Sequence, residues 1–196
     1  MLGVSVPEAL LLGSALGLGA FAVSSQRDDV ASVRASDGRE YLVQNAYPDR
    51  AAAAEMLARL RARLQAFIAY AEGRPDVAAD PRIVRLSANW NRETLNEGSN
   101  HSSYTSFTTD KTDITMCLRS ATTNRLEPEP LLTFVLLHEA AHCATEYAAD
   151  AHNADFWANF KFILEVAVAG GLYVKHDFRA RPVVFCGVDV TNSPLQ

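Results

Sequence analysis

Residues 131–142 read LLTFVLLHEAAH, and this stretch decides the fold class of the chain. An apolar run leads directly into the HEAAH motif, which predicts a buried α-helix. On a helix, positions i and i+4 lie about 40° apart and roughly 6 Å along the axis, so His138 and His142 project from the same face. Two neutral imidazoles at this separation can bind one Zn²⁺ ion.

Glu139 lies between the two histidines and is turned to the side of the pair. From there it can reach a metal-bound water without being a ligand itself. The pattern is specific, because five His and eleven Glu would produce a chance match in fewer than about one chain in a hundred. The alternative is a surface helix with two spare histidines. The apolar residues upstream argue against it, since buried His and Glu side chains need partners and a cation supplies them.

A catalytic zinc site needs a third protein ligand and one open position. His152 is the best candidate, because residues 143–151 can finish the helix, reverse and present it ahead of a second helix. That helix is predicted over residues 153–169, with Asn153 as its cap. Three carboxylates on or beside the second helix are the alternatives: Glu165, Asp150 and Asp155.

These roles predict a zinc-dependent metalloendopeptidase that hydrolyses peptide bonds by a metal-activated water, with Glu139 as the general base. One further donor is expected at the oxyanion. The candidates for it are Tyr104, Tyr173 and His176. Two other functions remain open: a different zinc hydrolase of amides, and a non-catalytic, zinc-stabilised structural protein of a membrane or virion. The intact Glu139 argues against the structural protein, because a purely structural site needs no base.

The rest of the chain predicts an α+β domain. Apolar positions recur at helical spacing over residues 50–72, where Arg59, Arg61 and Arg63 are expected to face solvent. Strands are predicted over residues 41–43, 83–86, 103–108, 113–118 and 183–190, the last interrupted at Gly187. We expect a small antiparallel or mixed sheet packed on the two active-site helices. Residues 113–118 are expected to be its edge strand and to align an extended substrate by β-addition.

The N-terminal segment differs from the rest, because residues 9–26 carry no charge and are mostly apolar up to residue 23. This run is slightly short of the roughly 20 residues that span a bilayer. The sequence predicts a hydrophobic segment over residues 1–26 that acts as a single membrane anchor, with a buried helix as the alternative. A linker is predicted over residues 27–40 and the peptidase domain over residues 41–196. The expected location is therefore a membrane.

Composition limits the partners. A net charge of −5 gives no basic footprint for nucleic acid, so a protein or peptide substrate is expected. The three cysteines form no CxxC pair, and an odd, sparse set does not indicate a disulfide framework. We therefore expect a reducing compartment, or none in particular, and a buried, apolar environment for Cys143.

Residues 135–173, VLLHEAAHCATEYAADAHNADFWANFKFILEVAVAGGLY, resemble the WLM and SprT-like metallopeptidases, in which HExxH is followed by a histidine just ahead of an aromatic-rich helix. The likeness is nearest to the shorter WLM-like metallopeptidases of large DNA viruses and algae, which implies a viral or host-cell membrane, or the virion, as the location. Three further motifs of that group read here as Tyr104-Thr105, Cys117-Leu118-Arg119 and Cys186-Gly187. The resemblance implies a zincin-like core in which His138, His142 and His152 bind zinc and Glu139 is catalytic.

Overall fold

The computed structural model describes residues 29–90, 94–98, 106–146 and 152–196. The predicted N-terminal anchor lies outside these residues, as do Tyr104 and Asp150. Among the described helices, none combines the length and the apolar character needed to cross a bilayer. Membrane association therefore stays a prediction.

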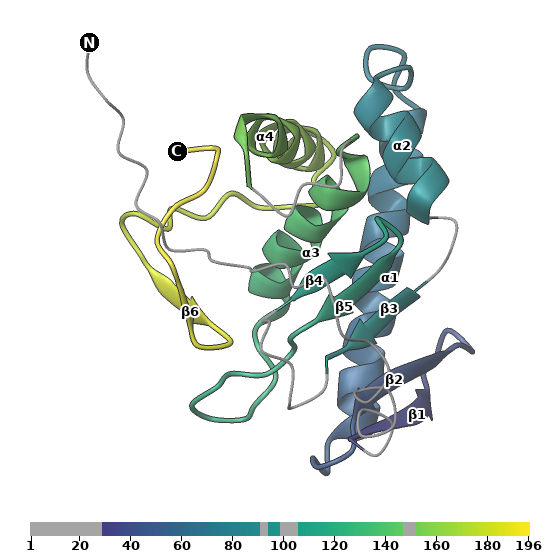
Figure 1. Ribbon diagram of the computed structural model, residues 1–196, viewed down its shortest axis with the longest axis vertical. Coiled ribbons are helices and arrows are strands. Elements are labelled where there is room, and N and C mark those ends of the chain that lie inside the picture. The colour runs from purple at the N-terminus through teal and green to yellow at the C-terminus, as the bar shows by residue number, and fades with distance from the viewer. Residues whose placement is uncertain (1–28, 91–93, 99–105, 147–151) are drawn as a thin grey trace.

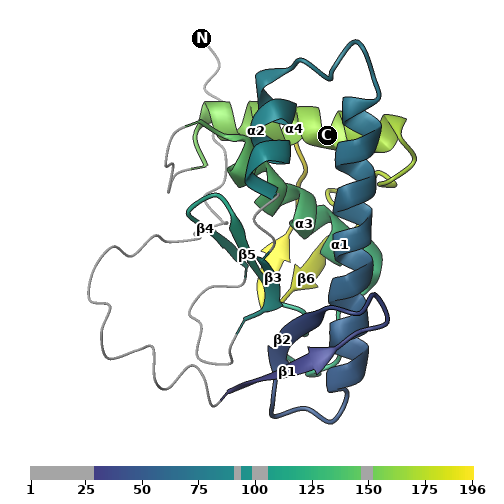
Figure 2. The same cartoon turned by 90° about the vertical axis from the view of Figure 1, so that its right-hand side faces the viewer.

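The described chain is an α+β domain, which confirms the predicted class at that level. Its helices are α1 (Arg50–Glu72), α2 (Pro81–Trp90), α3 (Glu129–Ala144) and α4 (Ala154–Ala169). Helix α3 is central, because it contacts each of the three other helices. A small sheet lies in front of it (Figures 1 and 2). This position explains why the sequence of α3 is apolar on nearly every side rather than along one stripe.

The strands are short and form three small sheets within the described residues. They are β1 (Val30–Arg34), β2 (Glu40–Gln44), β3 (Thr94–Glu97), β4 (Phe107–Thr109), β5 (Asp113–Met116), β6 (Val183–Phe185) and β7 (Val188–Val190). The pairs β1–β2 and β6–β7 are antiparallel hairpins. The third sheet has the order β3-β5-β4 and is mixed, with β3 parallel and β4 antiparallel to β5.

The predicted edge strand is wrong, because β5 lies at the centre of the mixed sheet. Its second neighbour, β3, escaped the sequence analysis since Thr94–Glu97 is only four residues long and largely polar. Glu97 is nevertheless buried in β3, where it accepts a hydrogen bond from the backbone N–H of Gln44 and pairs with Arg119 at 2.9 Å. The strand that forms the sheet edge beside α3 is β4.

The strand predicted over residues 83–86 is also wrong, because these residues belong to α2. The buried side chains of α2 are Ile83, Leu86 and Trp90, spaced three and four apart, so the apolar pattern is helical. Pro81 stands in the first turn, where its missing N–H has no helical partner to lose. Four residues are too few to distinguish the helical period of about 3.6 residues from the strand period of 2.

The arginines of α1 do not all face solvent. Arg61 is buried, with only 4% of its surface exposed, and its guanidinium lies 5.4 Å from the ring centre of Trp90. Arg59 and Arg63 both pair with Glu129 at the start of α3, at 2.9 and 2.7 Å. Arg59 is exposed as predicted although it pairs with Glu129, whereas Arg61 packs against α2 and Arg63 helps to attach α1 to α3.

The range predicted as a linker contains a folded strand. Residues 30–34 form β1, which pairs with β2 from Val30↔Gln44 to Arg34↔Glu40. Ala35 is buried directly after it, and β1 also contacts α1. In the structure, this part of residues 27–40 therefore packs with the domain that follows it.

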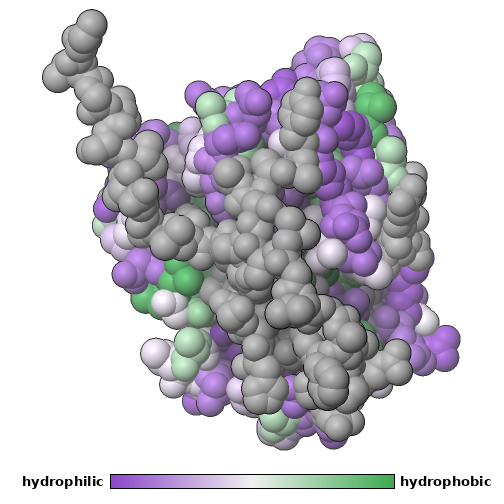
Figure 3. Space-filling model, in the orientation of Figure 1, coloured by the Kyte–Doolittle hydropathy of each residue, from purple (hydrophilic) through white to green (hydrophobic). Residues whose placement is uncertain are grey.

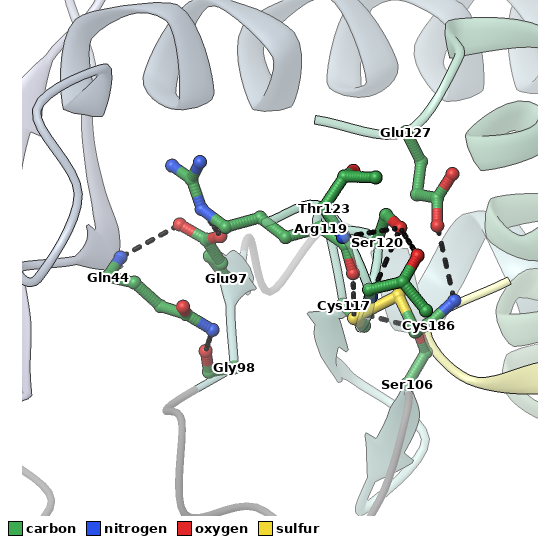
Figure 4. Close-up of a disulfide and its surroundings, with 11 residues drawn as sticks. Gln44, Glu97, Gly98, Ser106, Cys117, Arg119, Ser120, Thr123, Glu127 and Cys186 are labelled. Atoms are coloured by element: carbon green, nitrogen blue, oxygen red, sulfur yellow. Dashed lines mark hydrogen bonds and ion pairs between the residues drawn. A yellow bond between two sulfur atoms is a disulfide. The ribbon is translucent and has the colours of Figure 1, made fainter. Parts of the chain in front are cut away.

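A disulfide joins Cys117, just after β5, to Cys186, in the turn between β6 and β7 (Figure 4). The prediction that the cysteines form no disulfide is therefore wrong, and with it the expectation of a reducing compartment loses its basis. Spacing could not reveal the pair, because 69 positions separate the two residues. Cys143 is free and fully buried, which confirms its predicted apolar environment.

Candidate metal centre

Helix α3 presents His138 and His142 from one face, as the i, i+4 spacing predicts. Their ring centres are 5.1 Å apart. His138 is buried and His142 is half-buried, so the pair lies below the surface. The helix ends at Ala144, and Thr145 follows in an extended conformation.

His152 reaches the pair from the start of α4. It directly precedes Asn153, the N-cap of α4, whose side chain accepts a hydrogen bond from the backbone N–H of Phe156 at 2.9 Å. The Nε2 atoms of His152 and His138 are 3.0 Å apart, and the ring centres of His152 and His142 are 5.2 Å apart. Each of the three histidines offers a ring nitrogen within 4.8 Å of the other two.

The distance between His138 and His152 is close to that expected for two histidines that share one tetrahedral metal ion. Zn–N bonds of about 2.0–2.1 Å in a tetrahedral site separate ligand nitrogens by roughly 3.3 Å. The observed distance of 3.0 Å between His138 and His152 lies close to that value. In the absence of an ion, the Nε2 atoms of His138 and His152 lie within hydrogen-bond distance of each other. Imidazole nitrogens suit transition metals such as zinc, copper, iron and nickel, whereas magnesium and calcium select oxygen ligands.

Aromatic side chains of α4 hold the imidazoles in place. Phe156 stacks on His142, with ring centres 4.3 Å apart, and its edge meets His138 at 4.9 Å. Phe160 lies 5.1 Å from His138 and Trp157 lies 5.6 Å from His152. The aromatic residues that the sequence places on α4 therefore form the apolar surroundings of the three histidines.

Burial also keeps the imidazoles neutral. Desolvation, together with the neighbouring His142 and His152, lowers the pKa of His138 well below its ordinary value. Burial lowers the pKa of His142 to about 4, and desolvation lowers that of His152 as well. A neutral imidazole is the form that binds metal, so the fold prepares these residues as ligands.

Glu139 is fully buried beside the histidines and is oriented by strand β4. The hydroxyl of Thr108 donates a hydrogen bond to its Oε2 atom at 2.7 Å. Its other carboxylate oxygen has no hydrogen-bond partner among the described residues. Burial raises the pKa of Glu139 to about 8, and a cation nearby would favour the charged form again. The carboxylate thus has one oxygen held by Thr108 and one that is available to another hydrogen-bond donor.

The alternative ligands lie away from this point or outside the described residues. Glu165 is exposed on α4 and lies 4.0 Å from Lys161. Asp155 is exposed in the first turn of α4, and Asp150 is not described. Of the described His, Cys, Asp and Glu residues, only the three histidines converge as a group that could hold a metal ion.

Of the predicted oxyanion donors, the two that the structure describes, Tyr173 and His176, do not line the site. Tyr173 is buried, with its ring 6.1 Å from that of Phe134, and it does not line the cavity that His138 and Glu139 share. His176 is hydrogen-bonded through Nε2 to the carbonyl oxygen of Arg181 at 3.0 Å. Tyr104 lies outside the described residues.

Two groups of residues at the site were missed from the sequence. Thr108 was included in a predicted strand, but nothing in the pattern indicated that its hydroxyl would meet Glu139. The hairpin β6–β7 contributes Phe185, Val188 and Val190 to the cavity beside the site. The sequence did carry a signal for that hairpin, namely the interruption of the predicted strand at Gly187. In the structure, Cys186 and Gly187 both have positive φ and form a two-residue turn there.

Removing the cap of α4 should weaken the protein by a modest amount. We expect Asn153→Ala to lower the free energy of unfolding by about 1 kcal/mol, because the N–H of Phe156 loses its acceptor. Chemical denaturation of the metal-free protein measures this. Lys161→Ala, an exposed position of the same helix, is the control and should change stability by less than about 0.5 kcal/mol. Equal effects in the two variants would show that the cap contributes nothing.

Comparison with known proteins finds one clear relative. The chain is 30% identical over 181 residues to a protein of Acanthamoeba polyphaga mimivirus described as "Uncharacterized protein R325". The match covers 90% of this chain and 90% of the mimivirus protein. No family model matches the chain. No solved structure matches it either.

Proposed function

The chain belongs to the same family as the mimivirus protein R325, and we propose that it is a zinc-dependent metallopeptidase. The observation that carries this proposal is the convergence of three ring nitrogens within 4.8 Å beside a buried carboxylate. His138, His142 and His152 would hold the zinc, and Glu139 would act on the water that attacks the peptide bond. Both His138 and Glu139 line one cavity, so a substrate could reach them from the same side.

Zinc bound by three neutral histidines supplies a Lewis acid that polarises a carbonyl and lowers the pKa of water. Glu139 would take the proton of the attacking water and pass it to the leaving amine. The Oε1 atom of Glu139, which has no hydrogen-bond partner among the described residues, is the one that would accept this proton. The Thr108 hydroxyl holds the other oxygen, which fixes the orientation of the carboxylate. The apolar rings of α4 shield His138 and part of His142 from bulk water, which strengthens electrostatic interactions there.

Strand β4 is the element we propose for aligning the substrate. It is the edge strand of the described mixed sheet beside α3, and Thr108 on this strand contacts Glu139. An extended peptide that added to this edge would pass next to the carboxylate. With this arrangement the scaffold would be zincin-like, in agreement with the resemblance to WLM and SprT-like peptidases.

Metal analysis combined with a cleavage assay tests the proposal. Purified protein should contain one zinc per chain and cleave unfolded protein substrates, and chelation should stop cleavage until zinc is restored. His152→Asn should lose zinc and activity together, because one of three ligands is removed. Asp155→Asn, which alters an exposed acid of the adjoining helix turn, should retain both. Zinc binding without any cleavage would favour the structural alternative.

A further inference from the structure

The hairpin β6–β7 forms one wall of a cavity that adjoins the proposed catalytic residues. From the helices, the cavity is lined by Val135 and Phe160, and His138 and Glu139 form part of the same lining. The hairpin closes it with Phe185, Val188 and Val190. In Figure 1 the hairpin lies to the left of α3. The cavity is therefore mostly apolar, with the reactive groups at one part of its surface.

Strand alternation explains which hairpin residues face the cavity. Phe185 pairs with Val188, and Val183 pairs with Val190, so these side chains share one face of the hairpin. Val184 pairs with Asp189 on the opposite face, and 55% of the surface of Val184 is exposed. Figure 3 shows a small hydrophobic area on the side of the molecule where Figure 1 places β6. Within one hairpin, Val188 thus belongs to the cavity wall and Val184 does not.

The disulfide holds this wall in position. Cys186 is bonded to Cys117, and its backbone N–H donates a hydrogen bond to Glu127 at 3.2 Å (Figure 4). The backbone N–H of Cys117 in turn donates to the hydroxyl of Ser106, which itself lines the cavity. These links fix the hairpin relative to the start of β4. A wall held in this way can select a ligand by size.

The volume of the cavity limits what it can hold. Its volume is about 40 Å³, roughly a quarter of the ~150 Å³ apolar cavity that holds a benzene ring in another protein. By this comparison the space suits an aliphatic group better than an aromatic ring. Valine, leucine and isoleucine side chains have this size, whereas phenylalanine and tryptophan are larger.

We propose that this cavity binds a small branched aliphatic side chain of the substrate, next to the peptide bond that is cleaved, and that Val188 sets the size limit. The inference rests on the proposed peptidase function and specifies its substrate class. The apolar lining favours an aliphatic group, the volume restricts its size, and the shared wall with His138 and Glu139 places it beside the reaction.

Cleavage of a peptide library with all side chains varied around the cut tests the proposal in the full-length, zinc-loaded protein. The wild type should prefer Val, Leu or Ile over Phe at one position beside the cut by roughly tenfold or more in kcat/KM. Val188→Ala should raise the Phe-to-Leu ratio at that position by about tenfold, and Val188→Phe should shift the preference to Ala. Val184→Ala should reproduce the wild-type profile, because this side chain lies on the outer face.

Zinc content and melting temperature establish that each variant is folded before its profile is compared. An unchanged preference in both folded Val188 variants would overturn the inference and leave the peptidase function standing. A wild-type protein that holds zinc but cleaves no member of the library would overturn both. A shift in Val184→Ala as large as that in Val188→Ala would also contradict the assignment of the wall.

Discussion

Replacing Glu139 with Gln should lower kcat/KM for peptide hydrolysis roughly 10²–10⁴-fold while zinc remains bound at the wild-type stoichiometry. Gln has the same shape as Glu, and its amide oxygen can still accept the hydrogen bond of Thr108. The variant therefore keeps the geometry of the site but cannot take a proton from water. Because Glu139 is not among the three convergent ligand groups, metal affinity should change little.

Two measurements on the same preparation decide this outcome: zinc per chain by elemental analysis, and cleavage of an unfolded protein or a peptide library. Glu165→Gln is the matched control, since it makes the same chemical change at an exposed position of α4 and should leave both quantities unaltered. Loss of zinc from Glu139→Gln would mean that the carboxylate is itself a ligand. Full activity in that variant would remove Glu139 from the mechanism.

Removing the disulfide should destabilise the protein by about 4 kcal/mol, by the loop-entropy relation for 69 residues. In the double variant Cys117→Ala, Cys186→Ala the unfolded chain is no longer cross-linked. It therefore has more conformations to lose on folding. For a chain of this size, that loss corresponds to a decrease of roughly 10 °C in melting temperature. The melting temperature should be measured at a fixed zinc concentration, because a bound ion also stabilises the folded state.

Thiol labelling gives an independent check of the same bond. The unfolded wild-type protein should react at one thiol, Cys143, before reduction and at three thiols after it. A reductant should lower the melting temperature of the wild type and leave that of the double variant unchanged. Labelling of all three cysteines without reduction, in protein prepared under oxidising conditions, would show that the bond does not form.

The sequence alone predicted the parts of the protein that depend on local periodicity. The helix over residues 50–72 coincides with α1, and the second active-site helix begins after the predicted cap Asn153. The relation of His138 to His142 required no tertiary information, since a helix fixes the direction of side chains four residues apart. A period of 3.6 is well defined over sixteen or more residues, but not over the four residues of 83–86, which were assigned to the wrong class.

Features that join distant segments could not be read from spacing. The parallel neighbour of β5 is a polar stretch that becomes a strand through its pairing with β5 and through the buried contact of Glu97 with Arg119. The disulfide closes 69 residues, and the same three cysteines would be consistent with other pairings or with none. The cavity combines α3, α4 and the hairpin, elements whose approach depends on the packing of the whole domain.

The sequence by itself determined that one turn of helix presents two imidazoles with a carboxylate between them, because backbone geometry within a helix is local and repeats. Among the described residues, the tertiary structure brings His152, and none of the acids, to the two histidines of α3. It also decided that Thr108 orients Glu139 and that a disulfide-linked hairpin walls the cavity. These contacts depend on where separate segments pack, and packing is set by the burial of apolar surface across the whole chain.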